Sequence, residues 1–144
     1  MRVRELLGRG RSPVITIDSD ARVDAAVRLM IEHRIGALPV MSGGMVVGIV
    51  SERDIVELLG REYGNVRSVP LSRIMRRAPT CNIDDDVRDL MVRMTGERLR
   101  HFVVMENGRL SGIVSVGDIV KRRLDELELE TGVLRDYVAG RRAS

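Results

Sequence analysis

Two motifs of identical pattern carry the side chains best suited to hold a small ligand. Ser51 precedes Asp54 by three residues, and Ser115 precedes Asp118 by the same spacing. At the start of a helix, Ser-x-x-Asp favours a capping box, in which each side chain satisfies a backbone N–H group of the other residue. The same place also favours a nucleotide, because free N–H donors attract phosphate and a carboxylate there accepts hydrogen bonds from both ribose hydroxyls. The residues alone leave both interpretations open.

The other reactive side chains lack the neighbours that catalysis requires. His33 and His101 are the two histidines, far apart in the sequence and without evident triad partners. No His, Cys or Asp cluster has metal-ligand spacing, and no glycine-rich phosphate loop ending in lysine is present. Cys81 is the single cysteine, which excludes an intrachain disulfide and fits a small packing residue in a reducing compartment. We therefore expect a protein that is not an enzyme, with neither a metal nor a catalytic cofactor.

The two motifs belong to an internal repeat. The segment from Gly48 to Val56 recurs from Gly112 to Val120, and the same offset extends backwards without gaps. Fifteen of the 44 residue pairs that start at Pro13 and end at Val56 are identical, where chance would give roughly three. The chain is therefore a duplication.

Each copy predicts the same order of elements, β-α-β-β-α. Apolar residues at helical spacing follow an acidic start at residues 18–20, and glycine-containing turns at residues 42–44 and 106–108 separate pairs of strand-like runs. The expected strands cover residues 14–17, 37–41 and 45–50, then the surroundings of Thr80 and Cys81, 102–105 and 109–114. The expected helices begin near residues 23, 51, 84 and 115.

The repeat divides the chain into four parts. We assign residues 1–62 to the first repeat, 63–70 to a linker, 71–128 to the second repeat and 129–144 to a helical tail. One repeat is too small to bury a good core alone, so the two should pack face to face. The charged, helix-prone stretch around the tail carries Leu124, Leu127, Leu134 and Tyr137, which suit either a solvated helix with one packed edge or a dimer contact.

Composition limits the class of function. The net charge is +3, the aromatic content is 2%, and Lys121 is the only lysine among the 24 basic residues. Arginine suits phosphate and carboxylate, although a compositional habit of the genome explains the excess equally well. The scarcity of aromatics and of a clustered basic run makes nucleic-acid binding the weaker interpretation. No apolar stretch is long enough for a membrane span or a signal peptide, so we expect a cytoplasmic protein.

At this point the sequence resembles a known family. Ile35-Gly-Ala-Leu-Pro-Val40, the hairpin with a glycine before its second strand, and two copies of Gly-Ile-Val-Ser-x-x-Asp-Ile-Val are similar to cystathionine β-synthase (CBS) domains. The likeness extends over residues 3–127 and is greatest to stand-alone two-repeat proteins of bacteria. It implies an α/β (α+β) fold in which two CBS repeats pack as a pseudo-two-fold Bateman module. It also implies a homodimer formed through the repeat helices and the C-terminal helix.

The resemblance implies a regulatory ligand and no catalytic cofactor. In this family the clefts between two repeats bind adenine nucleotides, such as AMP, ADP, ATP or NAD(H). Asp54 and Asp118 are the implied ribose ligands, with Ser51 and Ser115 beside them. The alternatives are a structural dimerisation protein with vestigial sites and, less favoured, a nucleic-acid-binding protein. The residues indicate no regulated target.

The implied phosphate contacts differ between the copies. Arg100 and His101 match the basic pair that faces the phosphates in nucleotide-binding members, in reversed order, so the role of each side chain stays open. Their counterparts are Gly36 and Ala37, which are small enough to let a ligand approach the backbone. Arg53 lies inside the first motif, where the second copy has glycine. Arg53 and Arg100 also suit solvated surface arginines.

The implied adenine contacts lie near the start of each repeat. The matching positions are Thr16, Ile17 and Ala21 in the first copy and Thr80, Cys81 and Asp85 in the second. Each is also an ordinary strand or turn residue. We expect two related clefts of unequal affinity.

Overall fold

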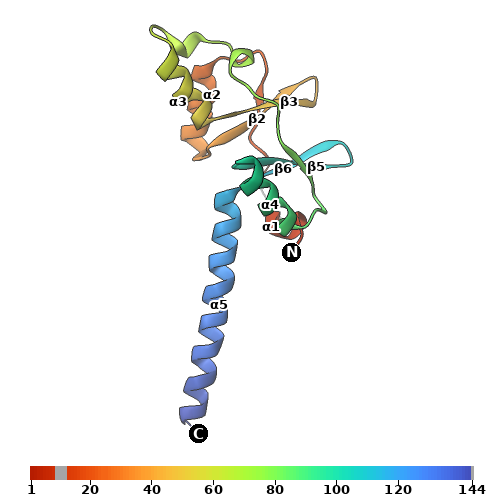
Figure 1. Cartoon of the computed structure of the whole chain (residues 1–144), viewed down its shortest axis with the longest axis vertical. Coiled ribbons are helices and arrows are strands. Elements are labelled where there is room, and N and C mark those ends of the chain that lie inside the picture. Colours follow the sequence, from red (N-terminus) through yellow and green to blue (C-terminus); the bar gives the residue numbers. More distant parts are fainter. Residues whose placement is uncertain (9–12, 144) are drawn as a thin grey trace.

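The computed structural model of the chain describes residues 1–8 and 13–143, with side chains described as far as residue 132 (Figure 1). Its helices are α1 (Val3–Leu7), α2 (Val23–His33), α3 (Glu52–Arg61), α4 (Val87–Glu97) and α5 (Val116–Ala143). Its strands are β1 (Ile17–Asp18), β2 (Ala37–Ser42), β3 (Met45–Ser51), β4 (Thr80–Asn82), β5 (His101–Glu106) and β6 (Arg109–Ser115). Two 3-10 turns, Val66–Ser68 and Leu71–Arg73, lie between the repeats. This α/β arrangement is the predicted one.

Each repeat contributes one three-stranded sheet, with the order β1-β2-β3 or β4-β5-β6. The first two strands of each sheet are parallel and the last two form an antiparallel hairpin. Gly43 and Gly44 turn the first hairpin with positive φ angles, as Asn107 and Gly108 turn the second. Two consecutive residues of positive φ match the right-handed twist of the strands, which confirms the predicted hairpins.

The first strand is shorter than predicted. We expected it to cover residues 14–17, but only Ile17 and Asp18 pair with β2, opposite Val40 and Met41. An apolar sequence favours a strand, but a strand also needs a neighbouring strand to pair with. Here the pairing with β2 begins only at Ile17.

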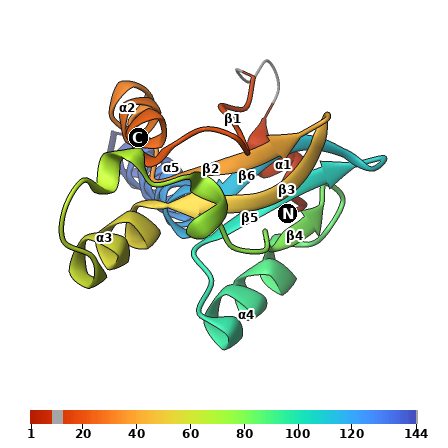
Figure 2. The ribbon, with the colours of Figure 1, turned by 90° about the horizontal axis from the view of Figure 1, so that it is seen from above.

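Three apolar clusters form the core. The first repeat buries Ile17, Val23, Ala26, Met30, Leu38, Val40, Val50 and Leu58. The second buries Cys81, Val87, Leu90, Met94, Phe102, Val104 and Val114 at the matching positions, together with Ile119, whose counterpart Ile55 is partly buried in the first repeat. A third cluster of Ala37, Ile49 and Val103 joins the two sheets, so the repeats pack against each other through β2, β3 and β5. Figure 2 shows the sheets side by side with the helices around them.

The segment before each repeat packs into the other repeat. Val3 is fully buried in the second core, and its N–H donates to the carbonyl of Asp85 at 2.9 Å. Leu71 is likewise buried in the first core, and its N–H donates to the carbonyl of Ala21 at 3.0 Å. The two cores therefore exchange their leading segments, and the domain boundaries at residues 62 and 71 stay a prediction.

The last helix is one continuous element. α5 begins directly after Ser115 and runs 28 residues, so the final helix of the second repeat and the expected tail are the same helix. It extends far beyond the sheets (Figure 1). Leu124 and Leu127 are about half exposed on it. The side chains of Leu134 and Tyr137 lie outside the described residues.

Candidate functional site

Asp54 is buried at the start of α3. Its Oδ2 accepts hydrogen bonds from the Ser51 N–H at 2.8 Å and from the Ser51 hydroxyl at 2.9 Å. The Asp54 N–H in turn donates to the Ser51 hydroxyl at 3.4 Å, which completes a capping box. Both residues are only 6% exposed. The capping interpretation of this motif therefore holds in the structure.

An arginine that the sequence did not single out occupies the other oxygen of this carboxylate. Arg76 Nε lies 2.7 Å from Asp54 Oδ1, and the Asp54 side chain is 7% exposed. The backbone of Arg76 exchanges two hydrogen bonds with Ile49, at 2.9 and 3.0 Å, so β3 holds this residue beside the motif. Both oxygens of Asp54 are thus engaged.

Asp118 makes the same cap in an open setting. Its Oδ2 accepts from the Ser115 N–H at 2.8 Å, and its own N–H donates to the Ser115 hydroxyl at 3.1 Å. Asp118 is exposed, and no described side chain bonds its Oδ1. The same Ser-x-x-Asp motif therefore gives one closed and one accessible carboxylate.

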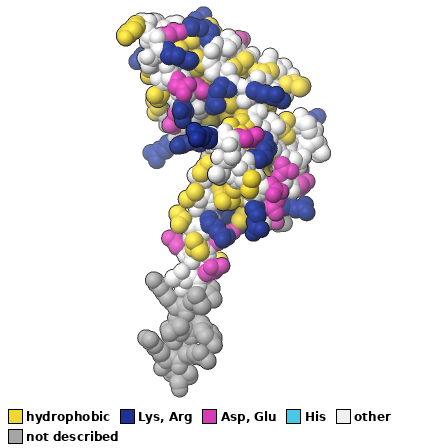
Figure 3. Space-filling view, viewed as in Figure 1, with side chains coloured by type: hydrophobic (Ala, Val, Ile, Leu, Met, Phe, Trp, Pro, Cys, Tyr) yellow, Lys and Arg dark blue, Asp and Glu magenta, His cyan; other side chains and the backbone are white. Residues whose placement is uncertain are grey.

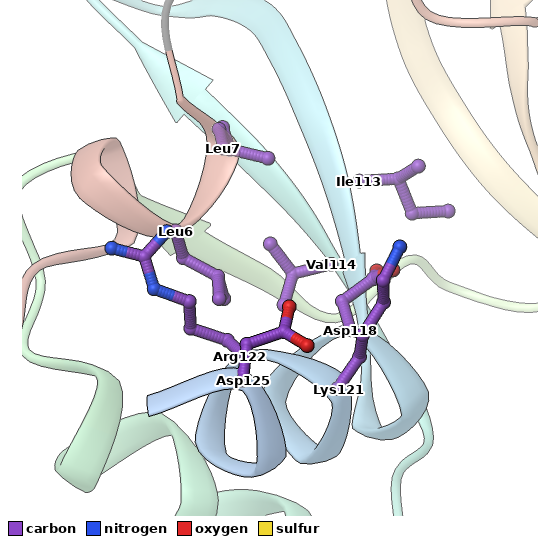
Figure 4. A pocket seen from close by; sticks show the side chains of 8 residues that line it. All are labelled: Leu6, Leu7, Ile113, Val114, Asp118, Lys121, Arg122 and Asp125. Carbon is purple, nitrogen blue, oxygen red and sulfur yellow. The ribbon is translucent and has the colours of Figure 1, made fainter. Parts of the chain in front are cut away.

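Asp118 lines a hollow of about 310 Å³. Figure 4 shows its walls, with apolar side chains from α1 and β6 and charged side chains from the first turns of α5. The lining residues are Leu6, Leu7, Ile113, Val114, Asp118, Lys121, Arg122 and Asp125. Apolar walls with a few charged groups are typical of a small-molecule site. Lys121 and Arg122 offer positive charge to an anionic group there.

His101 lies between the repeats. A Cβ placed on Gly36 would stand 3.2 Å from Glu52 Oε1 and 3.9 Å from His101 Nε2, so the glycine gives both side chains room. Burial lowers the pKa of His101; the carboxylates of Asp118 and Glu52 oppose this shift, whereas nearby arginines add to it. The imidazole is therefore mainly neutral at pH 7.

The basic residues predicted for phosphate contacts are spread over different surroundings. Arg100 and Arg76 are the arginines whose charges lower the pKa of His101, so they share its neighbourhood. Ala37 is buried in the cluster between the sheets. Arg53 is 80% exposed and pairs with Glu57 at 3.2 Å along α3, as a solvated arginine would. A phosphate contact of Arg53 stays a prediction.

Two of the predicted adenine contacts are core residues. Ile17 and Cys81 are each 6% exposed and belong to the first and second apolar cores. Burial raises the pKa of the Cys81 thiol to about 11, with a smaller contribution from Asp85. Because both side chains are buried in these cores, any contact with adenine would use their backbone.

The other adenine positions lie at strand starts and turns. Thr16 and Ala21 are half-buried, and the backbone of Ala21 bonds to Leu71. Thr80 is exposed, and its carbonyl accepts from Arg93 at 2.9 Å. Asp85 accepts the Asn82 N–H at 2.8 Å through its side chain. Their role toward adenine stays a prediction.

Two negative findings apply to the described part of the chain. There, no group of three or more His, Cys, Asp or Glu side chains is arranged to hold a metal ion. Within the same residues, no helix combines the length and the apolar character needed to cross a membrane.

Figure 3 shows basic and acidic side chains interspersed over one face of the molecule.

Comparison with known proteins identifies the repeats. The sequence model of the CBS domain matches residues 3–61 and 71–125. CBSX3, a mitochondrial CBS domain-containing protein of Arabidopsis thaliana, is 30% identical over 128 residues, which span 85% of this chain and 62% of the relative. The chain thus spans less than two thirds of that relative.

Three solved structures share the fold over most of both chains. The CBS-domain containing protein ATU1752 from Agrobacterium tumefaciens has a TM-score of 0.80 and 37% identity, with 85% of this chain and 99% of that chain covered. PAE2072 from Pyrobaculum aerophilum, complexed with AMP, has a TM-score of 0.75 and 27% identity, with coverage of 91% and 99%. The CBS domain pair of MJ0100, in complex with 5′-methylthioadenosine and S-adenosyl-L-methionine, has a TM-score of 0.76 and 26% identity, with coverage of 88% and 98%.

Proposed function

Because this chain belongs to the CBS-domain family, we propose that it is a regulatory module that binds an adenine nucleotide (AMP, ADP, ATP or NAD(H)) in the clefts between its repeats. The observation that supports this best is the exposed carboxylate of Asp118. It stands at the amino terminus of α5, beside a hollow whose apolar walls come from α1 and β6 and whose other charged side chains are Lys121, Arg122 and Asp125. A ribose diol would bond to the carboxylate while phosphate approaches the positive end of the helix.

The related complexes support the adenosine part of this ligand. The structure of PAE2072 is a complex with AMP, and that of MJ0100 is a complex with 5′-methylthioadenosine and S-adenosyl-L-methionine. These compounds share adenine and ribose and differ in what the 5′ position carries. The proposed role is binding without catalysis. A nucleotide regulates such a module only when its affinity differs between two conformations, because equal affinity shifts no equilibrium.

Exposed apolar side chains on the helices support a homodimer. On α2 and α3 these are Ile31, Val56 and Leu59, and on α4 and α5 they are Val92 and Leu124, all more than half exposed. Pairing of two copies through these helices would bury them. A dimerisation protein with vestigial sites is the second candidate, and the fully engaged carboxylate of Asp54 is the observation that favours it.

Thermal melting with a ligand panel separates these functions. The panel comprises AMP, ADP, ATP, NADH, S-adenosylmethionine and a short RNA. A ligand at 100 times its dissociation constant stabilises the folded state by about 2.7 kcal/mol, which gives a clear rise in melting temperature. We expect this rise with at least one nucleotide, and its loss in Asp118→Asn. Asp89→Asn, an exposed acid on α4, is the matched control. No shift with any adenine compound would refute the proposal.

A further inference from the structure

We propose that Arg76 closes the Asp54 cleft to a ribose, so that the chain binds one adenosine-containing ligand tightly at Asp118 and a second only when Arg76 leaves Asp54. This inference rests on the proposed function and assigns a specificity residue to one of its two clefts. The argument starts from the two identical motifs and their different surroundings.

The first step is the state of the two carboxylates. A ribose diol donates two hydrogen bonds, so a carboxylate that binds it needs acceptor oxygens that solvent can reach. Asp54 has Oδ2 bonded to Ser51 and Oδ1 paired with Arg76 at 2.7 Å, and its side chain is 7% exposed. Asp118 is exposed, and among the described residues its carboxylate is engaged only through Oδ2, by its cap. The carboxylate of Asp118 is therefore accessible to a ribose, whereas Arg76 blocks that of Asp54.

The second step is the structural equivalence that explains the asymmetry. A Cβ on Gly48 would meet the side chain of Met75 at 3.3 Å, and a Cβ on the equivalent Gly112 would meet Leu7 at 2.9 Å. Leu7 thus stands where Met75 stands in the other half. The next residue is Gly8 in one half and Arg76 in the other. Glycine carries no side chain to reach Asp118, whereas Arg76 reaches Asp54.

The third step concerns whether Arg76 can leave. Its backbone is fixed by the two hydrogen bonds to Ile49, but its side chain is 53% exposed. A half-exposed guanidinium keeps much of its hydration, so the ion pair contributes modestly and a ligand can displace it. Arg76 and Arg100 both lie close enough to His101 to lower its pKa, so a phosphate entering there would find Arg76 nearby.

Calorimetric titration of the full chain with AMP and with 5′-methylthioadenosine tests this assignment. The wild type should bind one equivalent tightly, and Arg76→Ala should bind two. Loss of the ion pair should strengthen the second site about fivefold to tenfold. Arg77→Ala, the exposed neighbour, is the matched control and should behave as wild type. Arg76→Gln serves the same purpose with less disturbance of the buried Asp54, should the alanine variant not fold.

The outcomes distinguish this inference from the proposed function. One equivalent in the wild type, two in a folded Arg76 variant and one in the Arg77 control support it. A wild type with two sites of equal affinity, or one equivalent in both Arg76 variants, overturns the gate and leaves ligand binding intact. A wild type that binds neither compound overturns the proposed function, and the gate with it.

Discussion

Replacing each motif aspartate by alanine should destabilise the ligand-free protein by different amounts. Asp54→Ala removes a charged acceptor from the buried Ser51 N–H and hydroxyl, and it removes the partner of Arg76. Hydrogen bonds to a charged group contribute about 1.5–3 kcal/mol, and the half-exposed ion pair adds at most about 1 kcal/mol. The expected cost is therefore roughly 3 kcal/mol. Asp118→Ala removes an exposed cap with the same local geometry, which costs about 1 kcal/mol.

Urea unfolding followed by circular dichroism measures this contrast directly. The free energy of unfolding should fall about 2 kcal/mol further for Asp54→Ala than for Asp118→Ala, with similar slopes against urea concentration. Because both residues occupy the same position of the same motif, each variant controls for the loss of a helix cap in the other. Equal destabilisation by the two substitutions would refute the claim that burial and Arg76 distinguish these carboxylates.

Three further predictions concern single residues. Burial lowers the pKa of His101 below its ordinary 6.5, so the unfolded chain binds more protons than the folded one. The stability of the wild type should therefore fall as the pH drops below about 6.5 and through the folded pKa. In urea unfolding, His101→Gln should lose this part of the pH dependence, and an unchanged profile would contradict the assignment. The Cys81 thiol, with its pKa raised to about 11, should resist a thiol reagent at pH 8 in the native protein and react in urea, so rapid native labelling would show that the site is open. Gly48→Ala places a Cβ 2.8 Å from the carbonyl oxygen of Arg76 and should lower the free energy of unfolding by about 1–3 kcal/mol. Gly112→Ala places its Cβ against the flexible side chain of Leu7 and should lower it less. Calorimetric melting that ranks the two variants the other way would refute this comparison.

The sequence predicts those parts of the fold that depend on local signals. Gly43, Gly44, Asn107 and Gly108 specify two-residue turns, so both hairpins could be placed. The repeat then carries the pattern from one half to the other. Helix α1 escaped prediction because five residues without a side-chain cap have little helical preference of their own. Its formation depends on contacts with the second repeat, such as that between Val3 and Asp85.

The candidate site could be predicted only as far as its motif. Ser51 and Asp54 match Ser115 and Asp118 in sequence, and the caps do form in both helices. The closure of one carboxylate could not be foreseen, since Arg76 lies at the start of the second repeat, just before the run of matched residue pairs begins. Backbone hydrogen bonds with Ile49 fix the place of Arg76 beside β3, and this place brings its side chain to Asp54.

The exchange of leading segments sets the order in which the two cores can be completed as the chain is synthesised. The first core spans Ile17 to Ile74, whereas the second spans Val3 to Ile119. The second core therefore closes a loop about twice as long, at an extra entropic cost of about 0.6 kcal/mol, and only after Ile119 has left the ribosome. Until then Val3 has no site to occupy. A fusion partner attached at the amino terminus would for this reason affect the folding of the second repeat, the one farther from it in the sequence, before that of the first.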